Sequence, residues 1–353
     1  MVKYIGSKRV LVPRIVDLVG SLRGVATVLD AFSGTARVSH ALKSHGLHVI
    51  ANDHNTYAYV LARCYVQANR DRVLSDARRL LAELNSLPGA PGWFTETYCV
   101  RSRYFMPHNG ARIEAIRNAI AAKDLDPDLE AVLLVSLMEA ADRVDSTTGV
   151  QMAYLKHWAP RARQNLELRL PQVLPGNGLA LQCEAIDAVR AHDVDLVYLD
   201  PPYNQHSYRG NYHIWETLVR WDQPEVYGVA CKRLDCRSYH SPYNSKRQIH
   251  AALSDVVREA RCRYLLVSFN NEGYVRPEDL ERMLAARGLV QTIEVDFRRY
   301  VGAQIGIFNP QGERVGKVSH LRNKEHLYLV SCEGTECGTA RAREELNASH
   351  APP

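Results

Sequence analysis

The sequence predicts an α/β fold built on a largely parallel sheet, with a mainly helical segment inserted into it. Strands alternate with helices in two stretches, one at 25–53 and one after residue 190, and 67–174 between them has a helical pattern instead. Such alternation is typical of parallel sheets, which gather ligands at the carboxyl ends of their strands. The chain has 353 residues, 46% hydrophobic and 24% charged. This composition suits one large globular domain that carries an insertion.

The first stretch reads VATVLDAFSGTARVSHALKSHGLHVIAND. It predicts a strand at 25–30, a turn of small residues at 32–36, a helix at 37–44 that stops near Gly46, and a second strand at 47–51. Asp53 follows about twenty residues beyond the turn, where an acid binds ribose hydroxyls in nucleotide-binding crossovers. The turn has a single glycine, Gly34, rather than a three-glycine fingerprint. Alone, it indicates a ligand-binding α/β domain and little more.

The second stretch resumes the alternation. It predicts strands at 194–200, 264–270, 289–297 and 326–332, and helices at 212–221, 246–260 and 277–287. The intervening segment predicts helices at 72–84, 112–122 and 130–141 around a loop rich in aromatic and basic residues. We therefore expect a discontinuous sheet domain at 1–66 and 175–335, an inserted domain at 67–174, and a loose tail at 336–353.

The strand at 194–200 ends in the motif Asp200-Pro201-Pro202-Tyr203. The prolines keep the chain extended and remove two N–H donors, so the motif presents a carboxylate and carbonyl oxygens as acceptors. Acceptors suit a donating ligand such as the exocyclic amino group of adenine or cytosine, and Tyr203 offers a flat face to the base. The motif favours methylation of an amino group by a sulfonium donor. A plain surface turn is the alternative, but Asp30, Asp53 and Asp200 all follow strands that end at one crevice.

Together these motifs resemble the D12 class of DNA adenine-N6 methyltransferases, Dam-like enzymes of the α group that use S-adenosylmethionine. The resemblance extends from about Val2 to Cys332. KYIGSK at 3–8 is similar to the family's N-terminal motif, DAFSGTA at 30–36 to its FxGxG motif, and DPPY to its catalytic motif; WFTETY, RYFMPHNGARIEAIR, NYHIWET and SFNNEG also resemble family segments. The resemblance implies a Rossmann-like methyltransferase sheet with an inserted target-recognition domain.

The resemblance also implies roles for individual residues. Asp200, Pro201, Pro202 and Tyr203 would hold the target adenine. The residues expected at the cofactor are Tyr4, Lys8, Asp30, Phe32, Ser33, Gly34, Thr35, Asp53, Glu184 and Asp200, with Lys8 as partner of the cofactor's carboxylate and Asp53 on its ribose. Ala36 stands where the family has a second glycine, and Glu184 where an aspartate is expected near the adenine ring, with Asp187 as a weaker choice. Structural alternatives are a solvated Lys8, a core position for Phe32 and a helix cap for Asp53.

A target base inside duplex DNA must be flipped out of the stack, at a cost of a few kcal/mol, before its amino group reaches the methyl donor. We expect the insert to recognise the DNA, because arginines suit phosphates and guanine, and asparagine suits adenine. The residues expected to contact DNA are Arg101, Arg103, Asn109, Arg112, Lys156, Arg161 and Arg163. Most basic side chains on any helix are simply solvated, which is the alternative at each position.

Other substrates remain open at this stage. RNA or protein amino methyltransferases use related motifs, cytosine-N4 enzymes more often have serine in place of Asp200, and an inert DNA-binding relative could keep the fold. Cytosine-C5 chemistry needs a cysteine nucleophile, usually after proline, and the sequence contains no Pro-Cys pair. The net charge of +5 permits a nucleic-acid partner. The sequence therefore favours an adenine-N6 enzyme acting on double-stranded DNA.

The remaining expectations concern setting and partners. The eight cysteines are scattered and lack CxxC spacing, so we expect reduced thiols and no metal site. No apolar run approaches the roughly 18 residues of a membrane span, and the N-terminus lacks a signal-peptide core, which predicts a cytoplasmic protein. We expect a monomer that either partners a restriction endonuclease acting on the same site or works alone as an orphan methylase.

Overall fold

The computed structural model describes residues 1–270, 273–298, 307–308, 314–316 and 322–332. The tail predicted at 336–353 and two residues of the SFNNEG segment, Asn271 and Glu272, lie outside this part of the chain. Within it, no helix is long and apolar enough to cross a membrane. The cysteines it includes are free thiols, and no three metal-ligating side chains come together among the described residues.

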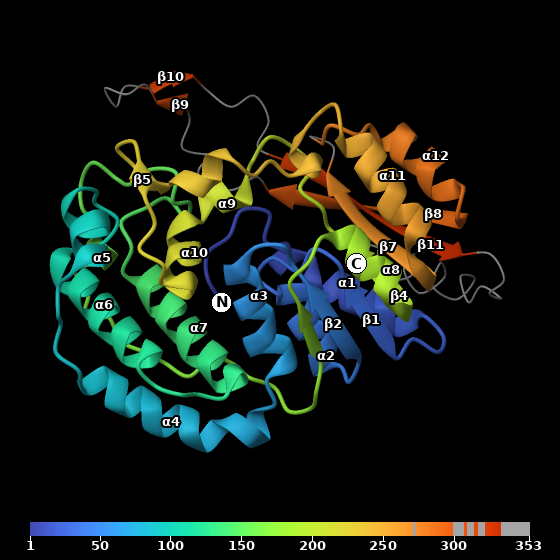
Figure 1. The fold of residues 1–353 in the computed structure, drawn as a ribbon. Coiled ribbons are helices and arrows are strands. Elements are labelled where there is room, and N and C mark those ends of the chain that lie inside the picture. The colour runs from blue at the N-terminus through green and yellow to red at the C-terminus, as the bar shows by residue number, and fades with distance from the viewer. Residues whose placement is uncertain (271–272, 299–306, 309–313, 317–321, 333–353) are drawn as a thin grey trace, which may run out of the picture.

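A seven-stranded sheet forms the centre of the protein, in the order β3-β2-β1-β4-β7-β11-β8. Its strands are β1 (Thr27–Asp30), β2 (His48–Asn52), β3 (Leu179–Leu181), β4 (Asp193–Leu199), β7 (Arg261–Asn270), β8 (Gly288–Arg298) and β11 (Arg322–Cys332). The pairs from β3 to β7 are parallel, whereas β11 runs antiparallel to both β7 and β8. The predicted largely parallel α/β sheet is confirmed, with β11 as the reversed strand (Figure 1).

Both faces of the sheet are buried by helices. Along β1, Val28 belongs to one hydrophobic cluster and Leu29 to the other, and Leu196 and Val197 of β4 divide in the same way. This alternation follows from the two-residue period of a strand. The first cluster includes side chains of α1 (Val12–Ser21), α2 (Arg37–Ser44) and α3 (Thr56–Ala62); the second includes those of α8 (Ala185–Ala191), α11 (Ile249–Glu259) and α12 (Pro277–Ala285) (Figure 1).

The segment between β2 and β3 contributes the helical lobe. Its helices are α4 (Arg70–Ser86), α5 (Trp93–Thr95), α6 (Pro107–Ala121) and α7 (Pro127–Arg143), so the helices predicted at 72–84 and 130–141 are present within α4 and α7. α6 begins five residues earlier than the predicted 112, because Pro107 suits the first turn of a helix.

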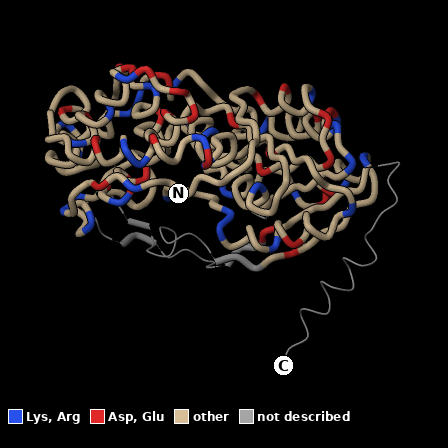
Figure 2. The backbone as a smooth tube through the Cα atoms, turned by 90° about the horizontal axis from the view of Figure 1, so that it is seen from below, with Lys and Arg blue, Asp and Glu red and all other residues tan. Residues whose placement is uncertain are grey.

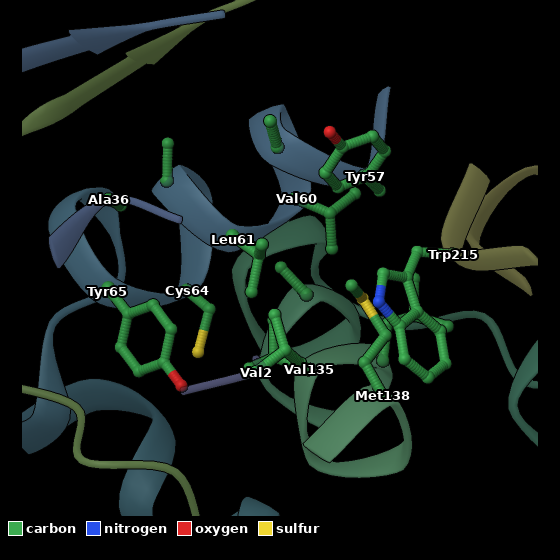
Figure 3. Packing of buried hydrophobic residues seen from close by; sticks show 14 of the residues in the cluster. Val2, Ala36, Tyr57, Val60, Leu61, Cys64, Tyr65, Val135, Met138 and Trp215 are labelled. Carbon is green, nitrogen blue, oxygen red and sulfur yellow. The ribbon is translucent and has the colours of Figure 1, made fainter. Parts of the chain in front are cut away.

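The helical lobe and the sheet share one core. Val135 and Met138 of α7 belong to the same buried cluster as Tyr57 of α3 and Trp215 of α10 (His213–Arg220) (Figure 3). The N-terminal segment joins them, since Val2 is 2% exposed and Lys3 Nζ lies 2.9 Å from Asp145 Oδ1. The proposed division into two domains therefore stays a prediction.

Several short elements were not predicted from the sequence. They are α9 (Tyr208–Asn211), the hairpin β5 (Val226–Tyr227) and β6 (Lys232–Arg233), the pair β9 (Ile307–Phe308) and β10 (Arg314–Gly316), the 3₁₀ turns η1 (Lys8–Val10), η4 (Pro160–Arg163), η5 (Leu234–Arg237) and η6 (Pro242–Asn244), and the π-helical turns η2 (Arg63–Gln67) and η3 (Glu96–Val100). β3, α1, α3 and α8 were missed as well. α9 and the β5–β6 hairpin follow the DPPY motif; α9 lies near the junction of the two lobes, and the hairpin lies on the side of the helical lobe, next to α10 (Figure 1).

Candidate active site

A cavity opens at the carboxyl ends of β1, β2 and β4. Every residue predicted at the cofactor lines this cavity: Tyr4, Lys8, Asp30, Phe32, Ser33, Gly34, Thr35, Asp53, Glu184 and Asp200. Other residues that line the cavity were not predicted from the sequence, among them Asn52, His54, Asn55, Cys183, Tyr208, Arg209, Tyr239 and Tyr243. Because parallel strands end at the same edge, side chains far apart in the sequence meet here.

The turn after β1 forms the floor of the cavity. Gly34 has φ +51°, a left-handed backbone conformation that favours glycine, and a Cβ atom there would only touch the Tyr4 ring at 3.4 Å. Its N–H donates to Asp53 Oδ2 at 3.0 Å. Ala36 has φ +57° at the start of α2, in the left-handed region, where the family's usual glycine would be unstrained. Asp53 thus ties the end of β2 to this turn.

Asp30 is a buried acid at the floor of the cavity, 1% exposed. Burial raises its pKa to about 7, although Ser39 Oγ donates to its Oδ2 at 2.6 Å. Within the described part of the chain, Asp30 Oδ1 and Ser33 Oγ are buried polar atoms with no hydrogen-bond partner. Buried polar atoms are normally paired. These two atoms therefore suit a polar ligand in the cavity.

Asp200 begins the catalytic motif directly after β4, with its side chain 18% exposed. Burial raises its pKa to about 6, while the nearby Lys8 ammonium lowers it and Glu325 raises it further. Tyr203 packs edge-on against Phe269, with ring centroids 5.4 Å apart, and its carbonyl accepts from the Tyr274 N–H at 2.8 Å. The motif is thus fixed to both β4 and β7. Pro202 lines the cavity beside Asp200.

Lys8 forms ion pairs within the protein. Its Nζ lies 3.0 Å from Asp200 Oδ1 and 2.5 Å from Glu325 Oε1. Lys8 is 6% exposed, so it is not a solvated side chain. The two carboxylates offset the cost of burying the ammonium, and its expected pairing with the carboxylate of the cofactor stays a prediction.

Tyrosine rings build one wall of the cavity. Tyr4 stacks on Tyr212 at 4.4 Å and on Tyr208 at 5.1 Å between centroids, and its hydroxyl lies 2.9 Å from that of Tyr57. Tyr212 also accepts a hydrogen bond from the Ile5 N–H at 2.6 Å. The N-terminal motif and the NYHIWET segment are therefore one packed unit, a pairing that their separation in the sequence concealed.

A polar cluster occupies another part of the cavity lining. Glu184 Oε1 lies 3.0 Å from His54 Nδ1 and accepts from the Tyr239 hydroxyl at 3.2 Å. His54 and Tyr239 stack at 4.2 Å, and the Arg209 guanidinium lies 4.5 Å from the Tyr239 ring centroid. Glu184 thus lies in the cavity lining, as predicted. The alternative Asp187 is exposed and is not part of the lining.

The model of the D12 class N6 adenine-specific DNA methyltransferases matches residues 4–283, which include the whole of this cavity's lining. The chain belongs to that family. Its fold and activity are therefore those that the resemblance implied: it is an adenine-specific DNA methyltransferase.

Curated relatives are modification enzymes. The type II methyltransferase M.NlaIII of Neisseria lactamica is 31% identical over 94% of this chain and 99% of its own length. Modification methylase StsI of Streptococcus sanguinis is 30% identical and the type II methyltransferase M.FokI of Planomicrobium okeanokoites 31% identical, each over 84% of this chain. The methyltransferase spans about half the length of the StsI and FokI enzymes, 48% and 49%, and nearly all of M.NlaIII.

Three residues predicted to contact DNA form hydrogen bonds within the protein; for Arg112 and Arg161, which are partly exposed, the DNA contact stays a prediction. Asn109 is 0% exposed; its amide donates to Ala162 O and Gln164 O and accepts from the Leu166 N–H. Arg112 donates to the carbonyls of Asn85 and Leu87, just at the end of α4. Arg161 pairs with Asp145 at 2.7 Å and donates to Thr147 O. The expectation that Asn109 contacts a base is wrong because its hydrogen-bonding groups are satisfied inside the lobe.

The other predicted DNA contacts are accessible. Arg101, Lys156 and Arg163 are exposed. Arg103 donates to Lys156 O at 2.7 Å, and its guanidinium lies 4.8 Å from the centroid of the Trp158 ring. Elsewhere, basic and acidic residues are interspersed along both lobes (Figure 2). The roles of these four residues therefore remain a prediction.

Proposed function

We propose that this methyltransferase transfers a methyl group from S-adenosylmethionine to the N6 atom of an adenine flipped out of duplex DNA at a specific site. The observation that carries the proposal is the meeting of the DPPY acid with the cofactor-type turn in one cavity. When bound, the cofactor supplies an electrophilic methyl group on a sulfonium. Asp30 Oδ1 and Ser33 Oγ are unpaired acceptors for a polar ligand, and Asp53 lies where ribose hydroxyls are bound.

The residues of the motif act on the amino group. The Asp200 carboxylate and the Pro201 carbonyl accept the two N–H bonds, which favours pyramidal, nucleophilic nitrogen at N6. With a pKa of about 6, Asp200 is ionised at neutral pH and is a better proton acceptor than an ordinary carboxylate. The ring of Tyr203 stacks on the flipped base, which offsets roughly 1 to 3 kcal/mol of the unstacking cost.

Methyl incorporation tests the proposal directly. Labelled S-adenosylmethionine should transfer label to unmethylated duplex DNA, and digestion to nucleosides should recover it as N6-methyladenine. Label in N4-methylcytosine, or in RNA alone, would contradict the assignment. A 2-aminopurine in place of the target adenine should gain fluorescence on binding if the base leaves the stack.

We further propose that the enzyme is a modification methylase that protects DNA from a restriction endonuclease with the same target site. The support is the likeness to M.NlaIII over 99% of that protein. Mapping the modified adenines gives the target site, and an endonuclease that cuts this site should be blocked on the methylated DNA. We propose a monomer, because one cavity and one flipped base suffice for a turnover; size-exclusion chromatography checks it.

The rate should fall in acid. Because Asp200 must be ionised to accept the N–H bond and burial raises its pKa to about 6, turnover should be full above that pH and drop as the pH falls through it. The dependence of kcat on pH, measured at saturating DNA and cofactor, should show an acid limb near pH 6. A kcat that does not change between neutral pH and pH 4.5 would contradict the role of Asp200.

Arg101 and Arg103 should contribute to DNA binding. The double change Arg101→Ala plus Arg103→Ala should weaken DNA binding and reduce the slope of log affinity against log salt by about 1 to 2, since each phosphate contact contributes roughly 0.9. Cofactor binding should not change. The matched control, Arg78→Ala plus Arg79→Ala, removes the same charge from the exposed side of α4. Equal effects of the two pairs in a filter-binding titration would place the recognition surface elsewhere.

A further inference from the structure

Glu325 is a buried carboxylate that no sequence motif marks. It lies on β11, the reversed strand of the sheet, and is 5% exposed. Its Oε1 atom accepts from Lys8 Nζ at 2.5 Å and from Ser268 Oγ, on the neighbouring strand β7, at 2.9 Å. Burying a carboxylate costs several kcal/mol unless partners compensate. Because the Glu325 carboxylate is buried next to the proposed reacting centre, we looked for a function that depends on its charge.

One cation lies between two carboxylates. Lys8 Nζ is 3.0 Å from Asp200 Oδ1 and 2.5 Å from Glu325 Oε1, so it is closer to the acid outside the motif. Lysine is a flexible point charge, and its place depends on what it is paired with. Glu325 lies on β11 where this strand pairs with both β7 and β8, opposite Asn270 and Val295, which makes it a rigid anchor.

We propose that Glu325 is a positioning residue of methyl transfer: it anchors the Lys8 ammonium beside one oxygen of Asp200 and keeps the carboxylate directed at the target amino group. The inference rests on the proposed role of Asp200. Without this anchor the ammonium would pair with Asp200 alone and compete with the amino group for the same lone pairs. Ser268 fixes the direction of the Glu325 carboxylate.

The charged groups around Asp200 affect its pKa, so a change in one of them should be measurable in the pH profile. Titratable groups from every neighbouring element face Asp200: Lys8 of η1, Asp30 of β1, Tyr198 of β4, Tyr203 and Tyr208 after β4, and Glu325 of β11. The negative charge of the Glu325 carboxylate raises the pKa of Asp200. A neutral glutamine at 325 removes that repulsion and leaves Lys8 to pair with Asp200. The pKa of Asp200 then falls.

Glu325→Gln tests the inference, because it keeps the size of the side chain and removes only its charge. We expect kcat to fall roughly tenfold or more, as for a misplaced catalytic group, and the acid limb of the pH profile to move to lower pH. The KM values for DNA and cofactor should stay within about twofold. The matched control is Glu294→Gln on the adjacent strand β8, whose side chain is 57% exposed; it should behave as wild type. A folded Glu325→Gln enzyme with wild-type kcat and an unmoved limb overturns the inference.

Two further variants complete the test. Ser268→Ala keeps both charges and loses the hydrogen bond that directs Glu325, so kcat should fall while the acid limb stays; wild-type kcat here also counts against the inference. In an Asp200→Asn background, Glu325→Gln should move no acid limb, since the group it acts on is gone. If Asp200→Asn alone retains full activity, the proposed role of Asp200 fails, and with it the premise of this inference; this outcome is distinct from a failure of Glu325 beside an essential Asp200.

Discussion

Asp200→Ala should lower the rate of methyl transfer by at least about 10²-fold, the effect typical of removing one preorganised polar group from a reacting centre. The carboxylate is the charged acceptor of the DPPY motif in the cavity, and alanine leaves the amino group without it. The fold should survive, because Lys8 keeps its 2.5 Å partner Glu325 when Asp200 is gone. Single-turnover incorporation of labelled methyl groups measures the chemical step.

The controls separate chemistry from folding and binding. Circular dichroism and the affinity for S-adenosylmethionine should stay close to those of the wild type. Asp193→Ala removes an exposed acid from the opposite end of the same strand, β4, and should leave the rate unchanged. Near-normal turnover by a folded Asp200→Ala protein would remove Asp200 from the mechanism.

The sequence predicted those parts of the site that depend on a short local pattern, here an apolar strand followed by an acid. Asp30, Asp53 and Asp200 were expected at one edge because each follows an apolar strand, and parallel strands end together. The structure places all three on the cavity. A short window of sequence is enough to recognise an apolar strand and the residue at which it ends. The position of the acid that follows such a strand can therefore be predicted from the sequence.

Contacts between distant segments could not be predicted in this way. Glu325 is 317 positions from Lys8, and nothing in the local pattern of β11 distinguishes it from other residues of the strand. The same holds for Tyr212, whose contact with Tyr4 joins the NYHIWET segment to the N-terminal KYIGSK motif. Glu325 lies on the same face of β11 as the buried Leu327 and Leu329, because side chains two apart share a face, but this pattern does not show that its partner is Lys8.

Asn109 shows how a local pattern can mislead. It lies among arginines and aromatic residues, a composition that suits DNA contacts. The proline at 107, however, starts α6 and places Asn109 in the first turn, where its amide satisfies the backbone of 162–166. The signal available in the sequence was the proline as a helix start rather than the surrounding charges.

Asp53→Ala should weaken the binding of S-adenosylmethionine by about 10² to 10³-fold. The carboxylate lies in the cavity at the end of β2, where an acid accepts hydrogen bonds from both ribose hydroxyls, and hydrogen bonds to a charged group contribute roughly 1.5 to 3 kcal/mol each. It also accepts from the N–H of Gly34 at 3.0 Å and of Asn55 at 2.9 Å, so its loss loosens the turn that forms the cavity floor.

The effect of Asp53 should appear in KM rather than in kcat, which distinguishes it from Asp200. In its proposed role Asp53 binds the cofactor's ribose and not the amino group of the base, so saturating cofactor should restore most of the rate. Asp53→Asn keeps an acceptor for one hydroxyl and should fall between the wild type and alanine. Asp187→Ala, an exposed acid outside the cavity lining, is the matched control for charge. If calorimetry finds wild-type affinity in Asp53→Ala, the acid serves only to hold Gly34 and Asn55 in place, and the ribose is bound by other groups.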